Sequence, residues 1–379
     1  MIALFWACLA VCVYVYFGYP ALLWSLSRVR AKPVVRGEAL PPVSIVIALY
    51  NEAAVVEEKI ANCRALDYPR ELLEVIFVSD GSTDQTETLV RHAEDEVIRL
   101  VALERGGKAR ALNEGVAAAR GEIIVFTDAN NFLEPDAVRM IVRNFADPEV
   151  GGVCGNKRLR AKEGDATGEG ENLYWRYDKW QKKLESRIGS IFAADGTLYA
   201  VRRSLYVPIA DPAQADDIAI STRVVLQGKR LVWEDDAVAW EDAPAEGPAE
   251  FRRKIRVTNH SVRALLKLGS ALYTSGFYSV ELLSHKLVRH LVPFFLIPLL
   301  ISNGALAATR GGLYSLLFAG QLVFYLAAFG GLVLRDTDAG KAKVFYVPYY
   351  FTLVNAAAFL GVVSIVTGTR HTVWSPRGS

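Results

Sequence analysis

The sequence predicts an α/β domain with a mostly parallel sheet, flanked by transmembrane helices at both ends. Long apolar runs lie near the two ends of the chain, and between them short β-branched runs alternate with helical patterns. Strands that alternate with helices favour a mostly parallel sheet covered on both faces. Such sheets bind their ligands at the carboxyl ends of the strands.

The amino-acid composition favours a membrane protein and argues against nucleic-acid-binding, disulfide-rich and zinc-binding proteins. The 379 residues are 52% hydrophobic, which is typical of a chain associated with a membrane. The 43 basic and 41 acidic residues give a net charge of +2, so we expect no nucleic-acid partner. The 4 cysteines have no paired-ligand spacing, and we expect neither a disulfide framework nor a zinc site.

Residues 1–27 are predicted to form the first transmembrane helix. Ile2–Leu26 carries no charge and exceeds the roughly 20 residues that a helix needs to cross a bilayer. A cleaved signal peptide is the alternative, but no basic residue precedes the run, and it is longer than a typical signal core. Basic residues follow at once, from Arg28 to Arg36, and they predict that the middle of the chain faces the cytosol.

The C-terminal third is predicted to cross the membrane again. Within 287–369 we expect three transmembrane helices, at Leu287–Ala308, Leu313–Leu334 and Val344–Val366. The preceding segment, 251–286, mixes Arg and Lys with apolar residues at helical spacing, which indicates amphipathic helices at the membrane surface. An ordinary surface helix is the alternative. Residues 370–379 are expected to form a tail.

The segment 28–250 contains the predicted α/β domain. We expect strands at Val43–Leu49, Glu74–Ser79, Val97–Leu103 and Glu122–Thr127. We expect helices at Ala53–Ala65, Gln85–Glu94 and Lys108–Ala119. The polar motifs of this segment follow the strands, where a parallel sheet places its ligands.

Acceptor groups follow the first two strands. The first strand ends Ala48-Leu49-Tyr50-Asn51-Glu52, and the second ends in Asp80-Gly81-Ser82-Thr83-Asp84. Buried acceptors at neighbouring strand ends suit the N–H groups and hydroxyls of a nucleoside. Taken alone, the second motif is explained equally well as a turn followed by a helix cap.

A glycine turn, Gly106-Gly107-Lys108, opens the helix that follows the third strand. Glycines permit close backbone approach, and the lysine and the helix N-terminus favour anionic groups. The spacing is not that of a Walker loop. A plain turn ahead of a helix is the alternative.

Asp128 and Asn130 follow the fourth strand, two residues apart. A carboxylate and an amide oxygen at this spacing can both reach one hard cation, and Mg²⁺ or Mn²⁺ would use such oxygen ligands together with substrate phosphates. The metal would neutralise charge on a diphosphate leaving group. A helix cap ahead of Glu134-Pro135 is the alternative.

In combination, these motifs resemble those of the family-two glycosyltransferases with the GT-A nucleotide-sugar fold. The resemblance runs from about Val43 to Leu266 and includes the placement of membrane helices in the synthase-like branch, with cellulose, chitin and hyaluronan synthases. It implies an inverting, metal-dependent transfer of sugar from a nucleotide-sugar, a UDP-sugar by preference, to a growing polysaccharide or lipid-linked glycan. It also implies a bacterial inner-membrane protein with a cytoplasmic catalytic domain.

The resemblance assigns roles on the donor side of the site. The residues implied to bind the nucleotide-sugar are Ala48, Tyr50, Glu52, Asp80, Lys108, Asp128 and Arg256. Asp128 and Asn130 stand where the family has its metal motif, and they would bind Mg²⁺ or Mn²⁺. Asn130 departs from the family's second carboxylate, so one negative charge fewer faces the metal.

On the acceptor side, Asp217 aligns with the family's catalytic base. An inverting transfer needs a base that takes the proton from the acceptor hydroxyl, and the neighbouring Asp216 can raise the pKa of such a base. An acidic pair that stabilises a helix start is the alternative. The residues implied to bind the acceptor are Asp195, Gly196, Asp216, Trp175 and Arg253. Trp175 belongs to the aromatic helical stretch Glu171–Arg187, for which a core-facing stripe is the alternative.

Arg253-Lys254-Ile255-Arg256-Val257 aligns with the Gln-Arg-x-Arg-Trp motif of processive synthases. Arg256 keeps the expected cation, whereas Arg253 and Val257 do not match, and the missing tryptophan argues against processive polymerisation. Without the family, this run is a basic membrane-surface patch. Single-sugar transfer to an isoprenoid-linked acceptor and a non-catalytic scaffold of the same fold remain alternatives. Membrane lipids are expected partners, and polymer export would need a second copy or an export partner.

Overall fold

The computed structural model describes residues 1–379 except 161–165, 212, 243–247, 336 and 369–379. The predicted tail, 370–379, lies outside the described residues. The chain divides into two compact units. The sheet unit comprises Arg30–Arg160 and Glu185–Asp242, and the helical unit comprises Met1–Val29, Ala161–Leu184 and Ala243–Arg370.

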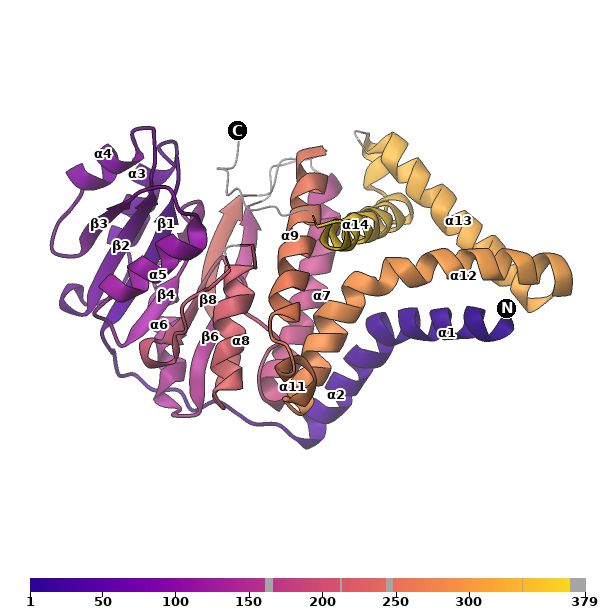
Figure 1. The fold of residues 1–379 in the computed structure, drawn as a ribbon, viewed down its shortest axis with the longest axis horizontal. Coiled ribbons are helices and arrows are strands. Elements are labelled where there is room, and N and C mark those ends of the chain that lie inside the picture. The colour runs from indigo at the N-terminus through magenta and orange to yellow at the C-terminus, as the bar shows by residue number, and fades with distance from the viewer. Residues whose placement is uncertain (161–165, 212, 243–247, 336, 369–379) are drawn as a thin grey trace. The chain divides into compact units, whose positions relative to one another are not determined.

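The sheet unit is built on one 8-stranded sheet with the order β3-β2-β1-β4-β7-β6-β8-β5 (Figure 1). The strands are β1 Val43–Leu49, β2 Leu73–Asp80, β3 Ile98–Leu103, β4 Ile123–Phe126, β5 Asn131–Leu133, β6 Val150–Arg160, β7 Tyr199–Arg202 and β8 Arg230–Asp242. The first four pair in parallel. β7 runs antiparallel to β4 and β6, β8 runs parallel to β6, and β5 runs antiparallel to β8. This mixed, mostly parallel arrangement confirms the predicted fold class.

Both faces of the sheet are covered, as the apolar strand sequences predict. Alternate residues of β1 point to opposite faces, so Ile45 and Ile47 pack in one core while Val46 and Ala48 pack in the other. The first core includes residues of α3 (Val56–Arg64), α4 (Thr86–His92) and α6 (Ala137–Val142). The second includes residues of α5 (Lys108–Ala118) and α8 (Asp216–Leu226). Three short 3₁₀ turns complete the unit, at Arg70–Leu72, Arg143–Ala146 and Arg203–Leu205.

The helical unit contains four helices that are long and apolar enough to cross a membrane, within the described residues: Ile2–Val29, Phe277–Arg310, Leu313–Leu334 and Lys343–Val366. The first consists of α1 (Ile2–Val13), the π-helical η1 (Tyr14–Gly18) and α2 (Tyr19–Val29). The second consists of α11 (Phe277–Glu281), the π-helical η5 (Leu282–Leu287) and α12 (Val288–Arg310). The third and fourth are α13 and α14, joined through the 3₁₀ turn Asp338–Lys341.

The second of these helices begins earlier than the sequence pattern indicates. Residues 277–286, expected among the amphipathic helices, continue into α12 because η5 keeps the chain helical between them. The rest of the segment 251–286 includes α9 (Pro248–Leu266) and the short α10 (Ala271–Thr274). The aromatic stretch lies in α7 (Ala166–Ile188), as predicted.

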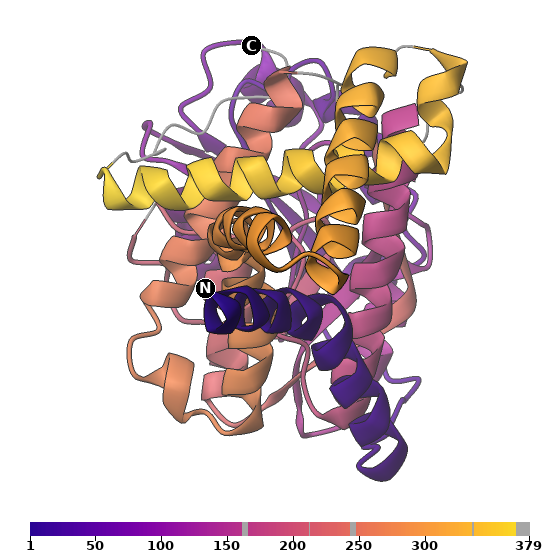
Figure 2. The same ribbon diagram turned by 90° about the vertical axis from the view of Figure 1, so that its right-hand side faces the viewer.

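Within the helical unit, α1 packs along α12, and α14 packs against α9 and α13 (Figures 1 and 2). The contact of α1 with α12 buries Phe5 and Cys8 with Val292 and Leu299. In contrast, α13 exposes a row of large apolar side chains: Leu316, Val323, Leu326, Phe329 and Val333. An apolar surface of this kind is typical of a helix that faces lipid.

Candidate active site

Hydrogen bonds tie the loops after β1 and β2 together. Asn51, which has a positive φ of 53°, exchanges hydrogen bonds with Thr83: its Oδ1 accepts from the Thr83 N–H (2.8 Å), and its Nδ2 donates to Thr83 Oγ1 (3.2 Å). The Glu52 N–H donates to Thr86 Oγ1 (2.9 Å), and the Ala53 N–H donates to Asp84 Oδ2 (3.1 Å). The Asp-Gly-Ser-Thr-Asp motif therefore joins two strand ends as well as starting α4.

Asp80, at the end of β2, organises the glycine turn. Its side chain is completely buried, and Oδ1 accepts hydrogen bonds from the N–H groups of Gly106 (2.7 Å) and Gly107 (2.9 Å). The Arg105 guanidinium pairs with the same carboxylate and lies over the Tyr50 ring, 3.4 Å from its centroid. A Cβ on Gly81 would lie 2.7 Å from the backbone nitrogen of Arg105, so only glycine fits at this position.

Arg105 is a site residue that the sequence reasoning missed. It precedes the glycine turn directly, and this position beside a motif was the only local signal available. Its stacking on Tyr50 joins the ends of β1 and β2 to the turn before α5. Tyr50 and Asp80, both predicted to bind the nucleotide-sugar, thus share Arg105 as a neighbour.

Lys108 brings the predicted metal motif and the start of α8 together. Its Nζ lies 2.8 Å from Asp128 Oδ1 and 3.1 Å from Asp216 Oδ2. Burial lowers the pKa of Lys108, but the charges of Asp128 and Asp216 outweigh burial and hold its pKa above the ordinary value. Lys108 therefore remains protonated, and its ammonium group bridges two carboxylates that are 88 positions apart in the sequence, since 216 − 128 = 88.

Asp217, the predicted base, lies in the first turn of α8 and faces the predicted acceptor segment. A Cβ on Gly196 would lie 3.8 Å from Asp217 Oδ2, an ordinary van der Waals distance, so Gly196 lies beside this carboxylate. Ser221 links the two segments, because its hydroxyl donates to the Asp217 carbonyl (2.6 Å) and accepts from the Ala194 N–H (3.0 Å). The helix α8 begins at Asp216, which places both carboxylates at its N-terminus.

Tyr199, the first residue of β7, is buried close enough to these carboxylates to interact with their charges. Its ring stacks on Phe126 with centroids 4.8 Å apart. Burial raises the pKa of Tyr199 well above its ordinary value, and the charges of Asp216 and Asp217 add to this effect. Within the described part of the chain, its buried hydroxyl has no hydrogen-bond partner. The sequence reasoning did not single out Tyr199 as a site residue.

Three predicted site residues belong to the helical unit. Trp175 lies on α7, and Arg253 and Arg256 lie on α9. Arg253 forms a two-point contact with Glu250, with Nε–Oε2 and Nη2–Oε1 distances of 2.6 and 2.8 Å. The other predicted residues, from Ala48 to Asp217, lie in the sheet unit.

The oxygen ligands of the predicted metal motif suit a metal ion that is also bound by the diphosphate of the substrate. Among the described residues, no group of three or more His, Cys, Asp or Glu side chains is placed to hold a metal ion. Asp128 keeps 37% of its side-chain surface exposed, and Asn130 is partly exposed as well. Because Mg²⁺ is usually held by one or two carboxylates plus substrate phosphates, a single carboxylate and an amide suit such a site.

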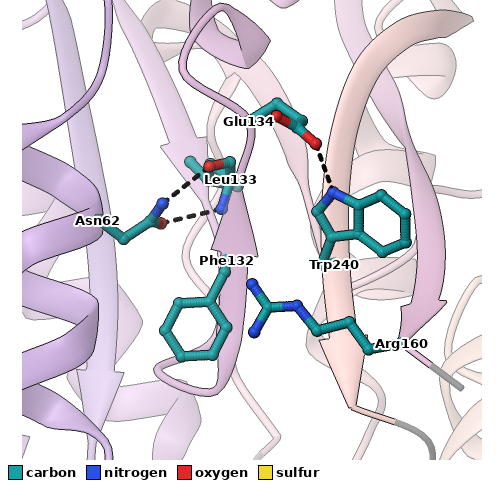
Figure 3. A pocket seen from close by; sticks show the side chains of 6 residues that line it. All are labelled: Asn62, Phe132, Leu133, Glu134, Arg160 and Trp240. Carbon is teal, nitrogen blue, oxygen red and sulfur yellow. Dashed lines mark hydrogen bonds between the residues drawn. The ribbon is translucent and has the colours of Figure 1, made fainter. Parts of the chain in front are cut away.

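A separate pocket of about 350 Å³ lies beside β5 and β8, at the edge of the sheet (Figure 3). The Trp240 indole N–H donates to Glu134 Oε1 (2.6 Å), and the Arg160 guanidinium lies 4.9 Å from the Phe132 ring centroid. Asn62 fixes one wall through two hydrogen bonds to the Leu133 backbone (2.8 and 2.9 Å). None of the predicted site residues lines this pocket.

Comparison with known proteins gives the same family that the motifs indicate. Residues 44–207 match the family described as Glycosyl transferase family 2. Poly-beta-1,6-N-acetyl-D-glucosamine synthase of Staphylococcus aureus (strain COL) is 27% identical over 262 residues, which is 67% of this chain and 62% of the relative. The synthase of Staphylococcus epidermidis is 27% identical over 232 residues, covering 59% of this chain and 56% of the relative. The match thus spans less than two thirds of these relatives.

A solved structure is similar over almost the whole chain. It is a mannosyltransferase from Pyrobaculum calidifontis in complex with GDP-Man and Mn²⁺. The likeness has a TM-score of 0.73 and 26% sequence identity, and it covers 97% of this chain and 100% of the other. The similarity therefore includes the flanking helices as well as the sheet unit.

Proposed function

We propose that this chain, which is a family 2 glycosyltransferase, transfers a sugar with inversion from a nucleotide-sugar to a growing polysaccharide or lipid-linked glycan at a membrane. A UDP-sugar is the donor we propose, with Mg²⁺ or Mn²⁺ as the metal. The observation that carries the proposal is the cluster of Lys108, Asp128 and Asp216, with Asp217 next in the same helical turn.

Each member of this cluster has a task in a single-displacement reaction. Asp217 takes the proton from the acceptor hydroxyl while that oxygen bonds to the anomeric carbon of the donor. The bond between this carbon and the diphosphate breaks, and the nucleoside diphosphate leaves with the electron pair. A metal held by Asp128 and Asn130 would neutralise the charge of this leaving group. Lys108, already protonated beside Asp128, would supply a further positive charge there.

The comparisons support the donor chemistry in general terms. The mannosyltransferase with the similar fold was solved with GDP-Man and Mn²⁺, a nucleotide-sugar and a divalent metal. In this chain, Asp80 with the glycine turn and Tyr50 with Arg105 would enclose the nucleoside. Arg256, on α9, is proposed to bind the diphosphate.

We place the enzyme in the bacterial inner membrane with the sheet unit in the cytoplasm. The four apolar helices support membrane insertion. The basic residues Arg28, Arg30, Lys32 and Arg36 follow the first helix and support the cytoplasmic placement of the sheet unit. Membrane lipids and a lipid-linked or carbohydrate acceptor are therefore the expected partners.

Transfer of one sugar to an isoprenoid-linked acceptor is a second candidate. One observation favours it over polymerisation: Val257 stands where the motif of processive synthases has a tryptophan. The number of sugars added distinguishes the two candidates.

The test uses the full chain in detergent or lipid nanodiscs. Radiolabelled UDP-sugars and GDP-mannose are supplied with membrane lipid extract, with and without Mn²⁺, and the products are separated by size. A ladder indicates polymerisation, and a single added sugar indicates the second candidate. Asp217→Asn should lower the rate at least ~100-fold, since general-base catalysis contributes at least that much. Asp136→Asn, an exposed carboxylate before α6, is the control. Turnover by Asp217→Asn at the parent rate would refute the assignment of the base.

A further inference from the structure

Lys59, on α3, is a completely buried lysine that the proposed chemistry does not use. Its Nζ donates to the Asn131 carbonyl oxygen and lies 3.5 Å from Thr127 Oγ1. These two partners, a carbonyl oxygen and a hydroxyl, carry no charge. Burial of an ammonium group is unfavourable unless other groups replace its water, so this lysine needs a structural or functional explanation.

The two partners of Lys59 stand on either side of the predicted metal motif. Thr127 precedes Asp128, and Asn131 follows Asn130. One ammonium group therefore holds both ends of the loop that carries the proposed metal ligands. Burial lowers the pKa of Lys59 below its ordinary value, while the nearby Cys63 and Asp128 act in the opposite direction. Asp128 is thus close enough for its charge to act on this lysine.

A chain of hydrogen bonds continues from this loop to the acceptor segment. The Thr127 hydroxyl donates to the Thr197 carbonyl oxygen (2.8 Å). Thr197 in turn donates to Asp195 Oδ1 through its N–H (3.0 Å) and its hydroxyl (2.6 Å). Thr127 and Thr197 are both buried, so water competes little for these bonds.

We propose that Lys59 is a positioning residue that fixes the Asp128–Asn130 loop against the Asp195–Thr197 segment. It acts through Thr127 and Asn131 and touches neither substrate nor metal. The inference rests on the proposed function, because it assumes that Asp128 and Asn130 bind the metal. Removal of a group that orients a metal ligand typically lowers metal affinity or activity ~10–100-fold.

The test compares two buried lysines of the sheet unit. Lys59→Met removes the ammonium group and keeps most of the side-chain volume. Lys157→Met is the matched control, because Lys157 is also buried but pairs with Glu241 between β6 and β8. Mn²⁺ binding to the full chain with saturating UDP is measured by electron paramagnetic resonance, together with the melting temperature.

Lys59→Met should bind Mn²⁺ ~10–100-fold more weakly than the parent, and excess Mn²⁺ should restore part of its activity. Lys157→Met should melt at a lower temperature and keep the Mn²⁺ affinity of the parent. If Lys59→Met does not fold, Thr127→Val serves instead. It removes the hydrogen bond from the Thr127 hydroxyl to the Thr197 carbonyl oxygen and keeps the ammonium charge of Lys59. Thr127→Val should weaken Mn²⁺ binding and raise the acceptor KM.

Two outcomes overturn the inference, and they differ. If the parent binds Mn²⁺ with UDP, and both Lys59→Met and Thr127→Val bind it as tightly, the positioning role is wrong and the proposed function stands. If the parent binds no Mn²⁺ with UDP, the proposed metal use fails, and the role of Lys59 fails with it.

Discussion

Replacement of Lys108 by methionine gives a prediction with two effects of opposite sign. The ammonium group bridges Asp128 and Asp216 at 2.8 and 3.1 Å. A divalent cation that binds Asp128 must compete with this ammonium group for the carboxylate. Lys108→Met removes the competitor and should strengthen the binding of Mn²⁺ alone. It also removes a positive charge from the proposed diphosphate site and should weaken the binding of UDP.

The contacts of Lys108 set the size of both effects. A hydrogen bond to a charged group contributes about 1.5–3 kcal/mol. Lys108 and Asp128 keep 22% and 37% of their side-chain surfaces exposed, which favours the lower end of this range. Because about 1.4 kcal/mol corresponds to a tenfold change in affinity, each effect should be roughly tenfold.

Mn²⁺ affinity without nucleotide is measured by electron paramagnetic resonance, and UDP affinity without metal by calorimetry. Lys229→Met is the control, since Lys229 is a partly exposed lysine of the same unit and pairs with Glu149 at 3.7 Å. It should change neither affinity. A Lys108→Met variant that binds free Mn²⁺ no more tightly than the parent would show that the lysine does not compete for Asp128.

Two further predictions concern the stability of the sheet unit. Glu234→Gln should destabilise the protein by about 3 kcal/mol in urea unfolding, because this completely buried carboxylate pairs with Arg143 (3.0 Å) and Arg36 (3.2 Å). Asp236→Asn, which removes the exposed partner of the same arginine, should cost less than about 1 kcal/mol, and equal costs for the two variants would contradict the reasoning. Burial raises the pKa of Asp84, but hydrogen bonds from Thr86 and Ala53 outweigh burial and lower its pKa below the ordinary value. The ionised Asp84 carboxylate therefore stabilises the folded protein fully at a pH above the pKa that Asp84 has in the unfolded chain. This stabilisation is lost as the pH falls through its lower pKa in the folded protein. Asp84→Asn should therefore lower the melting temperature at pH 6 more than at pH 3. An equal loss at both pH values would exclude the ionised form as the cause.

The strands that the sequence predicted are those with local, continuous apolar patterns. Val43–Leu49 has the predicted bounds, because every residue of β1 is buried and the sequence is apolar throughout apart from Ser44. β6 and β8 were missed. Their pairing shifts register between Cys154 and Asn156, where Trp233 is followed by Val238 as the next partner on β8. The polar residues of this irregular stretch, Glu234 to Asp236, break the alternation on which strand prediction depends.

The site was predicted as separate motifs and not as a set of contacts. Asp128, Lys108 and Asp216 were each identified, but no local pattern shows that the lysine pairs with both carboxylates. Arg105 was missed because its role comes from Tyr50 and Asp80, which lie at the ends of two earlier strands. Contacts of this kind depend on the order of strands in the sheet, which residue spacing alone does not determine.

The positions of Lys59 and Lys108 bear on how the binding of the nucleotide-sugar and the binding of the metal affect each other. Lys108 contacts Asp128 directly, and Lys59 holds the ends of the same loop from inside the core. Because Asn130 stands in place of a second carboxylate, this loop offers a metal one negative charge, and the ammonium group of Lys108 competes for it. Such a loop attracts a bare divalent cation weakly. A sugar diphosphate brings the missing negative charge and gives Lys108 a new partner, which frees Asp128 for the metal. Donor and metal should therefore bind cooperatively, and UDP should raise the Mn²⁺ affinity of the parent by a larger factor than that of Lys108→Met.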